Sequence, residues 1–196
     1  VVCDAVATPL KIIKKARISS FDKVGVIGAG GGLGIHMLKM LKLNNISAIG
    51  IDTKTEKFNI CNENGAEFSV SPMDNNLKNK IADFSKNNDL DVIIYFVSSK
   101  SSLELGCSIL GKGGRLVTLG GSGEQFLANS AEMLVKELEL IGSRYCTKQE
   151  LKESLDLYAR GLIEPLVSVK TDFDGAEDLH DKIEKGEITG RAGILI

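Results

Sequence analysis

The sequence predicts an α/β fold, a doubly wound parallel sheet of six strands with helices on both faces. Two observations predict it. Short apolar runs alternate along the chain with longer amphipathic stretches, the order expected of strand–helix–strand crossovers. Several of these runs, such as Val92–Val97, are apolar at every position, and that suits a strand buried on both faces rather than on one.

Each element follows from this alternation. The expected strands are, in chain order, Val24–Gly28, Ser47–Asp52, Glu67–Val70, Val92–Val97, Arg115–Leu119 and Leu138–Gly142. Between them, apolar residues recur at helical spacing and predict helices over Leu33–Lys42, Thr55–Asn64, Asn76–Asn87, Ser101–Leu110 and Ala128–Lys136.

The two ends of the chain fall outside the alternation. A helix over Ala5–Arg17, with Thr8-Pro9 near its start, leads in. After the sixth strand we expect a helix, a short strand, a second helix and a closing strand, at Lys148–Arg160, near Val167, at Asp174–Lys185 and at Ala192–Ile196.

Composition excludes several classes of protein. The net charge of −2 and the pI near 5.8 argue against an electrostatic nucleic-acid binder. The longest strongly apolar run, Val92–Val97, is far short of a membrane span. Four cysteines lie far apart without a CxxC pair, a pattern that fits neither a disulfide framework nor a zinc knuckle. We therefore expect a cytoplasmic protein without membrane or nucleic-acid partners.

A glycine-rich turn, Gly28-Ala29-Gly30-Gly31-Gly32-Leu33-Gly34, joins the first strand to the helix after it. Glycine loses more backbone freedom on folding than any other residue, so such a cluster needs a reason. In dinucleotide-binding units the glycines permit a tight turn, admit a pyrophosphate to the backbone, and let the helix pack close to the strand. Strict spacing would put the third glycine at Leu33. One extra residue instead sets Gly28, Gly31 and Gly34 at regular intervals and predicts a Rossmann-type domain.

An acid ends the second expected strand, in the run Ile49-Gly50-Ile51-Asp52. A carboxylate there can accept hydrogen bonds from both adenosine ribose hydroxyls, and this favours NAD(H) over NADP(H). The alternative role for Asp52 is to cap the helical segment beginning at Lys54. The order of strand, glycines, helix, strand and acid favours the nucleotide role. Lys57 is interpreted either as a ribose or phosphate contact or as an ordinary helix-surface lysine.

Several stretches together carry a resemblance: DAVATPLKIIKKARISSFDKVGVIGAGGGLG, GIDTKTEKFNICNENGAEFSV, GKGGRLVTLGG, ELELIGSRYCTKQELKESLDLYARGLIEPLVSV and KGEITGRAGILI. In this order they resemble the coenzyme-binding domain and the carboxy-terminal segment of medium-chain, zinc-dependent alcohol dehydrogenases. The resemblance implies a lead-in helix at 1–20, an NAD(P)-binding Rossmann domain at 21–146, and at 147–196 a segment that normally returns to the catalytic domain. The family's amino-terminal, GroES-like catalytic domain is missing from this chain.

The resemblance implies a role for particular residues. It assigns the pyrophosphate turn to Gly28, Gly30, Gly31, Gly32, Leu33 and Gly34, the ribose acid to Asp52, and its neighbour to Lys57. It assigns the wall of the cofactor crevice to Phe96 and Val97, and the contacts to the nicotinamide carboxamide to Leu119 and Gly120.

Two further assignments keep an alternative. Arg191 resembles an arginine that pairs with the pyrophosphate, a role that suits a planar guanidinium. Its alternative is a surface ion pair with Glu184 or Glu187. Thr8 resembles a threonine that packs on the nicotinamide ring, and its alternative is to cap the first helix.

The family's third catalytic zinc ligand falls near the start of the chain. Counting back from Gly28 suggests Cys3, whose thiolate suits tetrahedral zinc, whereas counting back from Thr8 suggests Asp4. Either way two further ligands are missing, so we expect zinc only in the full-length parent enzyme and interpret Cys3 here as a free thiol. His36 is expected to cap its helix or face solvent, His180 to be exposed, and neither to be catalytic. The remaining cysteines, Cys61, Cys107 and Cys146, are interpreted as small buried residues.

The sequence therefore predicts the NAD(H)-binding domain of an NAD-dependent, alcohol dehydrogenase-like oxidoreductase, inactive by itself. A zinc-free quinone or enoyl reductase of the same superfamily is one alternative, and a non-catalytic Rossmann module that senses NAD(H) is another. Family dimers pair through the sixth strand, so the resemblance also implies a homodimer through the edge strand 138–142, because an unpaired apolar edge is a liability in a monomer.

Overall fold

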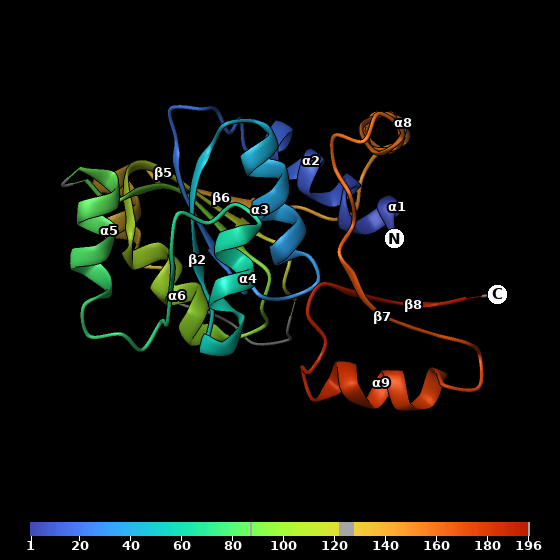
Figure 1. The fold of residues 1–196 in the computed structure, drawn as a ribbon. Coiled ribbons are helices and arrows are strands. Elements are labelled where there is room, and N and C mark those ends of the chain that lie inside the picture. The colour runs from blue at the N-terminus through green and yellow to red at the C-terminus, as the bar shows by residue number, and fades with distance from the viewer. Residues whose placement is uncertain (87, 122–127, 196) are drawn as a thin grey trace.

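A computed structural model describes residues 1–86, 88–121 and 128–195. Its centre is a six-stranded parallel sheet in the order β3-β2-β1-β4-β5-β6 (Figure 1). The strands are β1 (Lys23–Ile27), β2 (Ser47–Ile51), β3 (Ser69–Val70), β4 (Leu90–Tyr95), β5 (Leu110–Thr118) and β6 (Glu139–Gly142). The winding reverses between β1 and β4, and this confirms the predicted doubly wound sheet.

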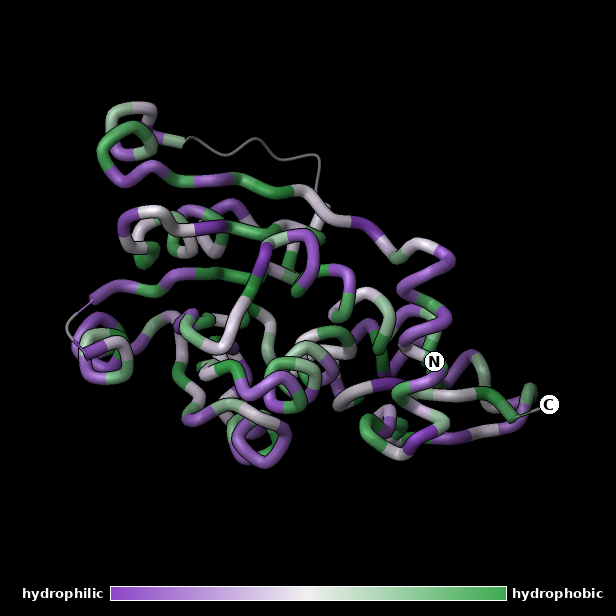
Figure 2. Tube along the Cα trace, turned by 90° about the horizontal axis from the view of Figure 1, so that it is seen from above, coloured by the Kyte–Doolittle hydropathy of each residue, from purple (hydrophilic) through white to green (hydrophobic). Residues whose placement is uncertain are grey.

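Both faces of the sheet are covered, because the strands carry apolar residues at consecutive positions. Val92 and Ile94 point into one buried cluster with helices α2 (Ala7–Lys15), α3 (Gly34–Leu43) and α4 (Phe58–Glu63). Their strand neighbours Ile93 and Tyr95 point into the other cluster, with helices α5 (Leu77–Ser85) and α6 (Lys100–Ser108). In Figure 2 the hydrophobic strand segments run through the interior between hydrophilic outer surfaces.

The lead-in segment is two helices rather than the single helix expected. Helix α1 (Val2–Ala5) ends before α2 begins at Ala7. Pro9 has no backbone N–H to donate to the carbonyl of Ala5, and its ring disfavours a continuous helix through that position.

Several expected boundaries also move. The helix predicted over Thr55–Asn64 begins as a 3-10 turn, η1 (Thr55–Lys57), and continues as α4. Helix α5 stops at Ser85 because Lys86 takes a left-handed conformation, with φ of 57°; the expected end at residue 87 lies outside the described residues. Leu110, the expected last residue of a helix, is instead the first residue of β5, which is therefore longer than predicted.

The carboxy-terminal part forms a second, smaller unit. After α7 (Ser130–Lys136) and β6, helix α8 (Lys148–Ala159) starts with a capping box between Thr147 and Glu150. Strands β7 (Val167–Thr171) and β8 (Arg191–Ile194) pair in parallel as a separate two-stranded sheet, joined by α9 (Ala176–Glu184). The expected end of the last strand, residue 196, lies outside the described residues. Both termini lie on the same side of the molecule (Figures 1 and 2).

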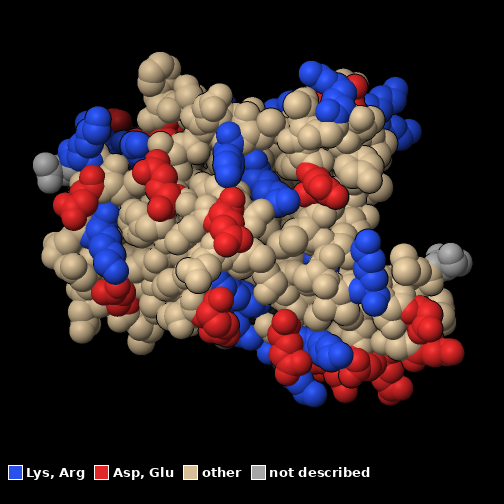
Figure 3. All heavy atoms as spheres, in the orientation of Figure 1, with Lys and Arg blue, Asp and Glu red and all other residues tan. Residues whose placement is uncertain are grey.

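Charged side chains of both signs alternate over the face drawn in Figure 3, and acidic ones gather over α9. No helix among the described residues combines the length and apolarity needed to cross a membrane.

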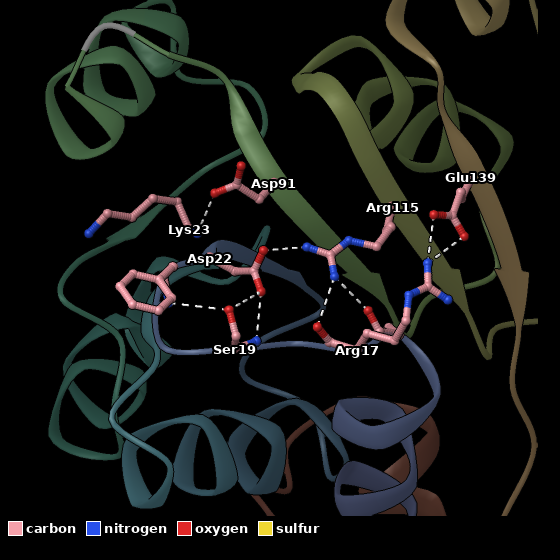
Figure 4. A network of polar contacts seen from close by, with 9 residues as sticks. Arg17, Ser19, Asp22, Lys23, Asp91, Arg115 and Glu139 are labelled. Carbon is pink, nitrogen blue, oxygen red and sulfur yellow. Dashed lines mark hydrogen bonds and ion pairs between the residues drawn. The ribbon is translucent and has the colours of Figure 1, made fainter.

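A polar network ties the lead-in loop to the amino ends of the strands (Figure 4). Arg115 on β5 forms an ion pair with Asp22, and its guanidinium also donates to the carbonyls of Ala16 and Arg17. The side chains of Arg115 and Asp22 are only 13% and 12% exposed. Nearby, Arg17 pairs with Glu139 of β6 in a much more exposed position. The network holds the loop that connects helix α2 to strand β1 against strand β5.

Candidate functional site

A cleft of about 400 Å³ opens at the carboxyl ends of β1, β2 and β4, where the winding of the sheet reverses. Open α/β sheets bind ligands at such a switch point. Its lining residues come from the glycine turn, the end of β2, the end of β4 and both chain ends: Asp4, Gly28, Gly31, Gly32, Leu33, Gly34, Asp52, Thr53, Lys54, Lys57, Phe96, Val97, Gly186 and Arg191. A cleft of about 480 Å³ between α2, α3 and α8 is larger but lacks this convergence of backbone donors, acid and arginine.

The glycine turn brings backbone to the cleft. Gly28 has a φ of 81°, a conformation that residues with a side chain rarely adopt. At the other end of the turn, a Cβ on Gly34 would lie 2.2 Å from the carbonyl oxygen of Gly28, so only glycine lets helix α3 start this close to β1. The N–H groups of Gly32 and Leu33 donate to no acceptor among the described residues. They are available, at the positive end of α3, to an anionic group.

Asp52 stands directly after β2 and faces the turn. One oxygen of its carboxylate accepts the N–H of Gly30 at 2.7 Å, and the other accepts the N–H of Lys54 at 3.0 Å. The bond to Lys54 closes the turn before η1, whose N-cap is Lys54 and which has no side-chain capping bond, so the alternative role of Asp52 as a helix cap is wrong. The bond to Gly30 joins the acid to the glycine turn. Each carboxylate oxygen keeps a further lone pair for a ligand hydroxyl.

Arg191 is the first residue of β8, near the end of the chain, and its side chain packs against the glycine turn. Its Nε is buried without an acceptor among the described residues, and it lies 3.2 Å from the position that a Cβ on Gly32 would take. Its Nη2 donates to Asp4 at 2.5 Å. The expected alternative partners, Glu184 and Glu187, are therefore wrong, and Asp4 takes their place. A guanidinium N–H with no partner beside free backbone N–H groups fits an anion such as a pyrophosphate.

Two lysines in the segment after Asp52 donate hydrogen bonds to the turn that follows α9. Lys57 is only 8% exposed and donates from Nζ to the carbonyl of Ile188, so its interpretation as a surface lysine is wrong. Burial lowers the pKa of Lys57. Lys54 donates from Nζ to the carbonyls of Lys185 and Gly186, at the carboxyl end of α9. Sequence reasoning missed Lys54, Thr53 and Gly186, because their part in the cleft depends on a segment far along the chain.

The predicted far wall of the site is partly in place. Phe96 and Val97, directly after β4, line the cleft as expected. Leu119 and Gly120 follow β5 and lie beside the end of β4. Leu119 donates its N–H to the carbonyl of Tyr95, and a Cβ on Gly120 would lie 1.9 Å from the carbonyl oxygen of Val97. These two residues do not line the cleft itself.

The remaining predicted residues sit around Asp4. Thr8 is buried inside α2 and donates to Asp4 at 3.0 Å, so its alternative as a helix cap is wrong. Cys3 is exposed, whereas Asp4, the alternative zinc ligand, lines the cleft with its carboxylate held by Arg191 and Thr8. Within the described residues no three His, Cys, Asp or Glu side chains are grouped as a metal site would need.

His36 contradicts its expected position. It is fully buried rather than solvent-facing, with Nδ1 2.7 Å from the carbonyl oxygen of Gly32 and Nε2 accepting the N–H of Leu166 at 3.0 Å. Burial lowers its pKa to about 4. His180 is exposed, as expected. Cys61 is buried, and burial raises the pKa of its thiol to about 11, whereas Cys107 and Cys146 are only partly buried.

Comparison with known proteins agrees with this geometry. Residues 32–160 match the family model described as zinc-binding dehydrogenase. The chain belongs to the zinc-binding dehydrogenase family. The match begins inside the glycine turn and ends one residue after α8. It covers strands β2 to β6 and the cleft residues from Gly32 to Val97, whereas β1, Gly28 and Arg191 lie outside it.

The proteins that this chain resembles differ in their named activities. An NAD-dependent alcohol dehydrogenase from Sulfolobus acidocaldarius is 28% identical over 94% of this chain and 53% of its own length. An acryloyl-coenzyme A reductase from Metallosphaera sedula is 26% identical over 90% of this chain and 52% of its own length. The solved acetophenone reductase from Geotrichum candidum, in complex with NAD, superposes with a TM-score of 0.82 at 27% identity, covering 96% of this chain and 52% of its own. The chain thus spans about half the length of these relatives.

Proposed function

We propose that this chain is the NAD(H)-binding part of an alcohol dehydrogenase-like oxidoreductase, in which it orients the nicotinamide for hydride transfer to or from an alcohol or carbonyl substrate. The observation that carries the proposal is the convergence of Asp52, the free N–H groups of Gly32 and Leu33, and the unpartnered Nε of Arg191 on one cleft. The kinship with dehydrogenases and with an NAD-bound reductase supports it.

In this proposal the residues divide the dinucleotide between them. The turn Gly28, Gly30, Gly31, Gly32, Leu33 and Gly34, together with Arg191, would hold the pyrophosphate, and Asp52 would accept the hydroxyls of the adenosine ribose, with Lys57 beside it. Phe96 and Val97 would form the wall toward the nicotinamide, whose carboxamide would meet Leu119 and Gly120, with Thr8 near its ring. A bound nicotinamide would supply the hydride chemistry. In a full-length parent, Cys3 or Asp4 would be one ligand of a zinc ion, and that ion would supply polarisation of an alcohol oxygen.

Asp52→Ala is expected to weaken binding of NADH about thirtyfold, because hydrogen bonds to a charged acceptor each contribute about 1.5–3 kcal/mol. Binding of NADPH should not weaken, since the variant also removes repulsion of the 2′-phosphate. The matched control is Asp83→Ala, which removes an exposed carboxylate from α5, away from the cleft. Fluorescence titration with both dinucleotides measures the effect. Equal affinity of wild type and Asp52→Ala for NADH would contradict the role of Asp52.

A zinc-free reductase is the second candidate, and the 26% identity with an acryloyl-coenzyme A reductase favours it. A tighter affinity for NADPH than for NADH would move the assignment to this branch. A third candidate, a sensor module without turnover, has less support, because the relatives described above are a dehydrogenase and reductases.

We also propose a homodimer formed through β6. This strand is an edge of the sheet, and Leu140 on it is 40% exposed. Light scattering should show a dimer that Leu140→Lys converts to a monomer, whereas Leu155→Lys, on the exposed face of α8, should leave the mass unchanged. A monomeric wild type would refute this interface.

A cytoplasmic location is part of the same proposal. All four cysteines, Cys3, Cys61, Cys107 and Cys146, are free thiols. Free, partly exposed thiols are typical of proteins kept in a reducing compartment.

A further inference from the structure

A closed circuit of contacts connects the glycine turn to the chain around β8. Its four residues are His36, Leu166, Arg191 and Gly32, each in contact with the next. The first link is His36 on α3. Its Nε2 accepts the N–H of Leu166, so the neutral ring carries its proton on Nδ1 and donates it to the carbonyl of Gly32 at 2.7 Å. The imidazole therefore joins the turn to the residue directly before β7 with one donor and one acceptor.

The second half of the circuit runs from Leu166 back to the turn. The carbonyl of Leu166 accepts the N–H of Arg191 at 2.8 Å. Gly190, with φ of 73°, fits against Leu166 so closely that a Cβ would lie 2.6 Å from the same carbonyl. The side chain of Arg191 then packs over Gly32, where the circuit began. The place of Arg191 relative to the turn therefore depends on where Leu166 is held.

We propose that His36 is a positioning residue: its neutral, Nδ1-protonated ring holds Leu166, and through Leu166 it sets Arg191 over the pyrophosphate-binding turn without touching the ligand. This inference rests on the proposed dinucleotide function and deepens it. Gly32 and Arg191 would serve the same phosphate, and His36 bonds to Gly32 directly and to Leu166, whose carbonyl holds the N–H of Arg191.

The circuit has a defined response to acid. Protonation of Nε2 turns an acceptor into a donor that faces the N–H of Leu166. It also places a cation near Arg191 of β8 and Lys39 of α3, which oppose it, and near Asp4 of α1, which favours it. Because burial lowers the pKa of His36 from 6.5 to about 4, the folded state favours the neutral ring. Its contribution to stability is complete above pH 6.5 and is lost as the pH falls through about 4.

Two variants of His36 test its hydrogen bonds to Leu166 and to Gly32 separately. In His36→Gln the carboxamide oxygen reaches as far as Nε2 and can still accept the N–H of Leu166. In His36→Asn the shorter carboxamide reaches only the position of Nδ1 and can still donate to Gly32. We expect NADH to bind about tenfold more weakly to His36→Asn, the cost of about one hydrogen bond, and within about twofold of wild type to His36→Gln.

Amide hydrogen exchange provides a readout that needs no cofactor. The N–H groups of Leu166 and Arg191 should exchange faster in His36→Asn than in wild type or His36→Gln. In an Arg191→Gln background, His36→Asn should have no further effect on NADH affinity, because the residue that it positions is gone. The unfolding temperature of wild type should fall more between pH 6.5 and pH 4 than that of His36→Gln.

The outcomes distinguish the two proposals. Unchanged exchange at Arg191 in His36→Asn, or an equal loss of affinity in the Asn and Gln variants, would overturn the positioning role. If wild type binds no dinucleotide, the proposed function fails, and the exchange at Arg191 still decides whether His36 positions it.

Discussion

Replacing Gly34 by alanine should lower the free energy of unfolding by about 3 kcal/mol and abolish dinucleotide binding. The added Cβ would lie 2.2 Å from the carbonyl oxygen of Gly28 and 2.6 Å from that of Ala29. Both are backbone atoms, so the start of α3 must move away from β1 to make room. That movement displaces the free N–H groups of Gly32 and Leu33, which we propose bind the ligand phosphate.

The matched control is Gly121→Ala, since a Cβ at Gly121 meets no atom of the described part of the chain within 4 Å. Denaturant unfolding should place Gly121→Ala within about 0.5 kcal/mol of wild type. A Gly34→Ala variant that is as stable as wild type and binds NADH normally would show that the close approach of helix to strand is not required.

Replacing Arg115 by methionine should destabilise the fold by about 3–5 kcal/mol, because it leaves the carboxylate of Asp22 buried without its partner. The carbonyls of Ala16 and Arg17 lose their donors as well. The loss should appear in chemical denaturation as a lower midpoint with an unchanged slope, since the compactness of the two states is retained.

Arg17→Met is the control from the same network (Figure 4). Its ion pair with Glu139 has exposures of 60% and 49%, and such surface pairs contribute about 0–1 kcal/mol. Adding Asp22→Asn to Arg115→Met should recover part of the loss, because the uncompensated charge is removed. If the two arginine variants are equally stable, burial does not govern the energy of this network.

The sequence alone was sufficient for the sheet, because each strand carries its own signal. Residues such as Val92, Ile93 and Ile94 face opposite sides of the sheet in turn, and a run that is apolar throughout reports burial on both faces. The glycine turn and Asp52 are equally local, since a strand, a turn and an acid in order specify their own positions at the carboxyl edge.

The rest of the candidate site depends on contacts between distant parts of the chain. Lys57 is buried because Ile188 lies over it, Arg191 pairs with Asp4 of the first helix, and His36 meets Leu166. Helical periodicity reports which face of a helix is apolar but gives no information on which remote backbone group a polar side chain will meet. A polar residue such as His36, inside an otherwise apolar helix segment, is the one signal in the sequence that invites a search for a buried partner.

The measurement that tests the central claim most directly is a calorimetric titration of this chain with NADH and, separately, with NADPH. The arrangement of Asp52, the free N–H groups of the glycine turn and Arg191 predicts saturable binding of NADH with one site per chain and a weaker affinity for NADPH. A tighter affinity for NADPH, or heat of dilution alone with both dinucleotides, would contradict it.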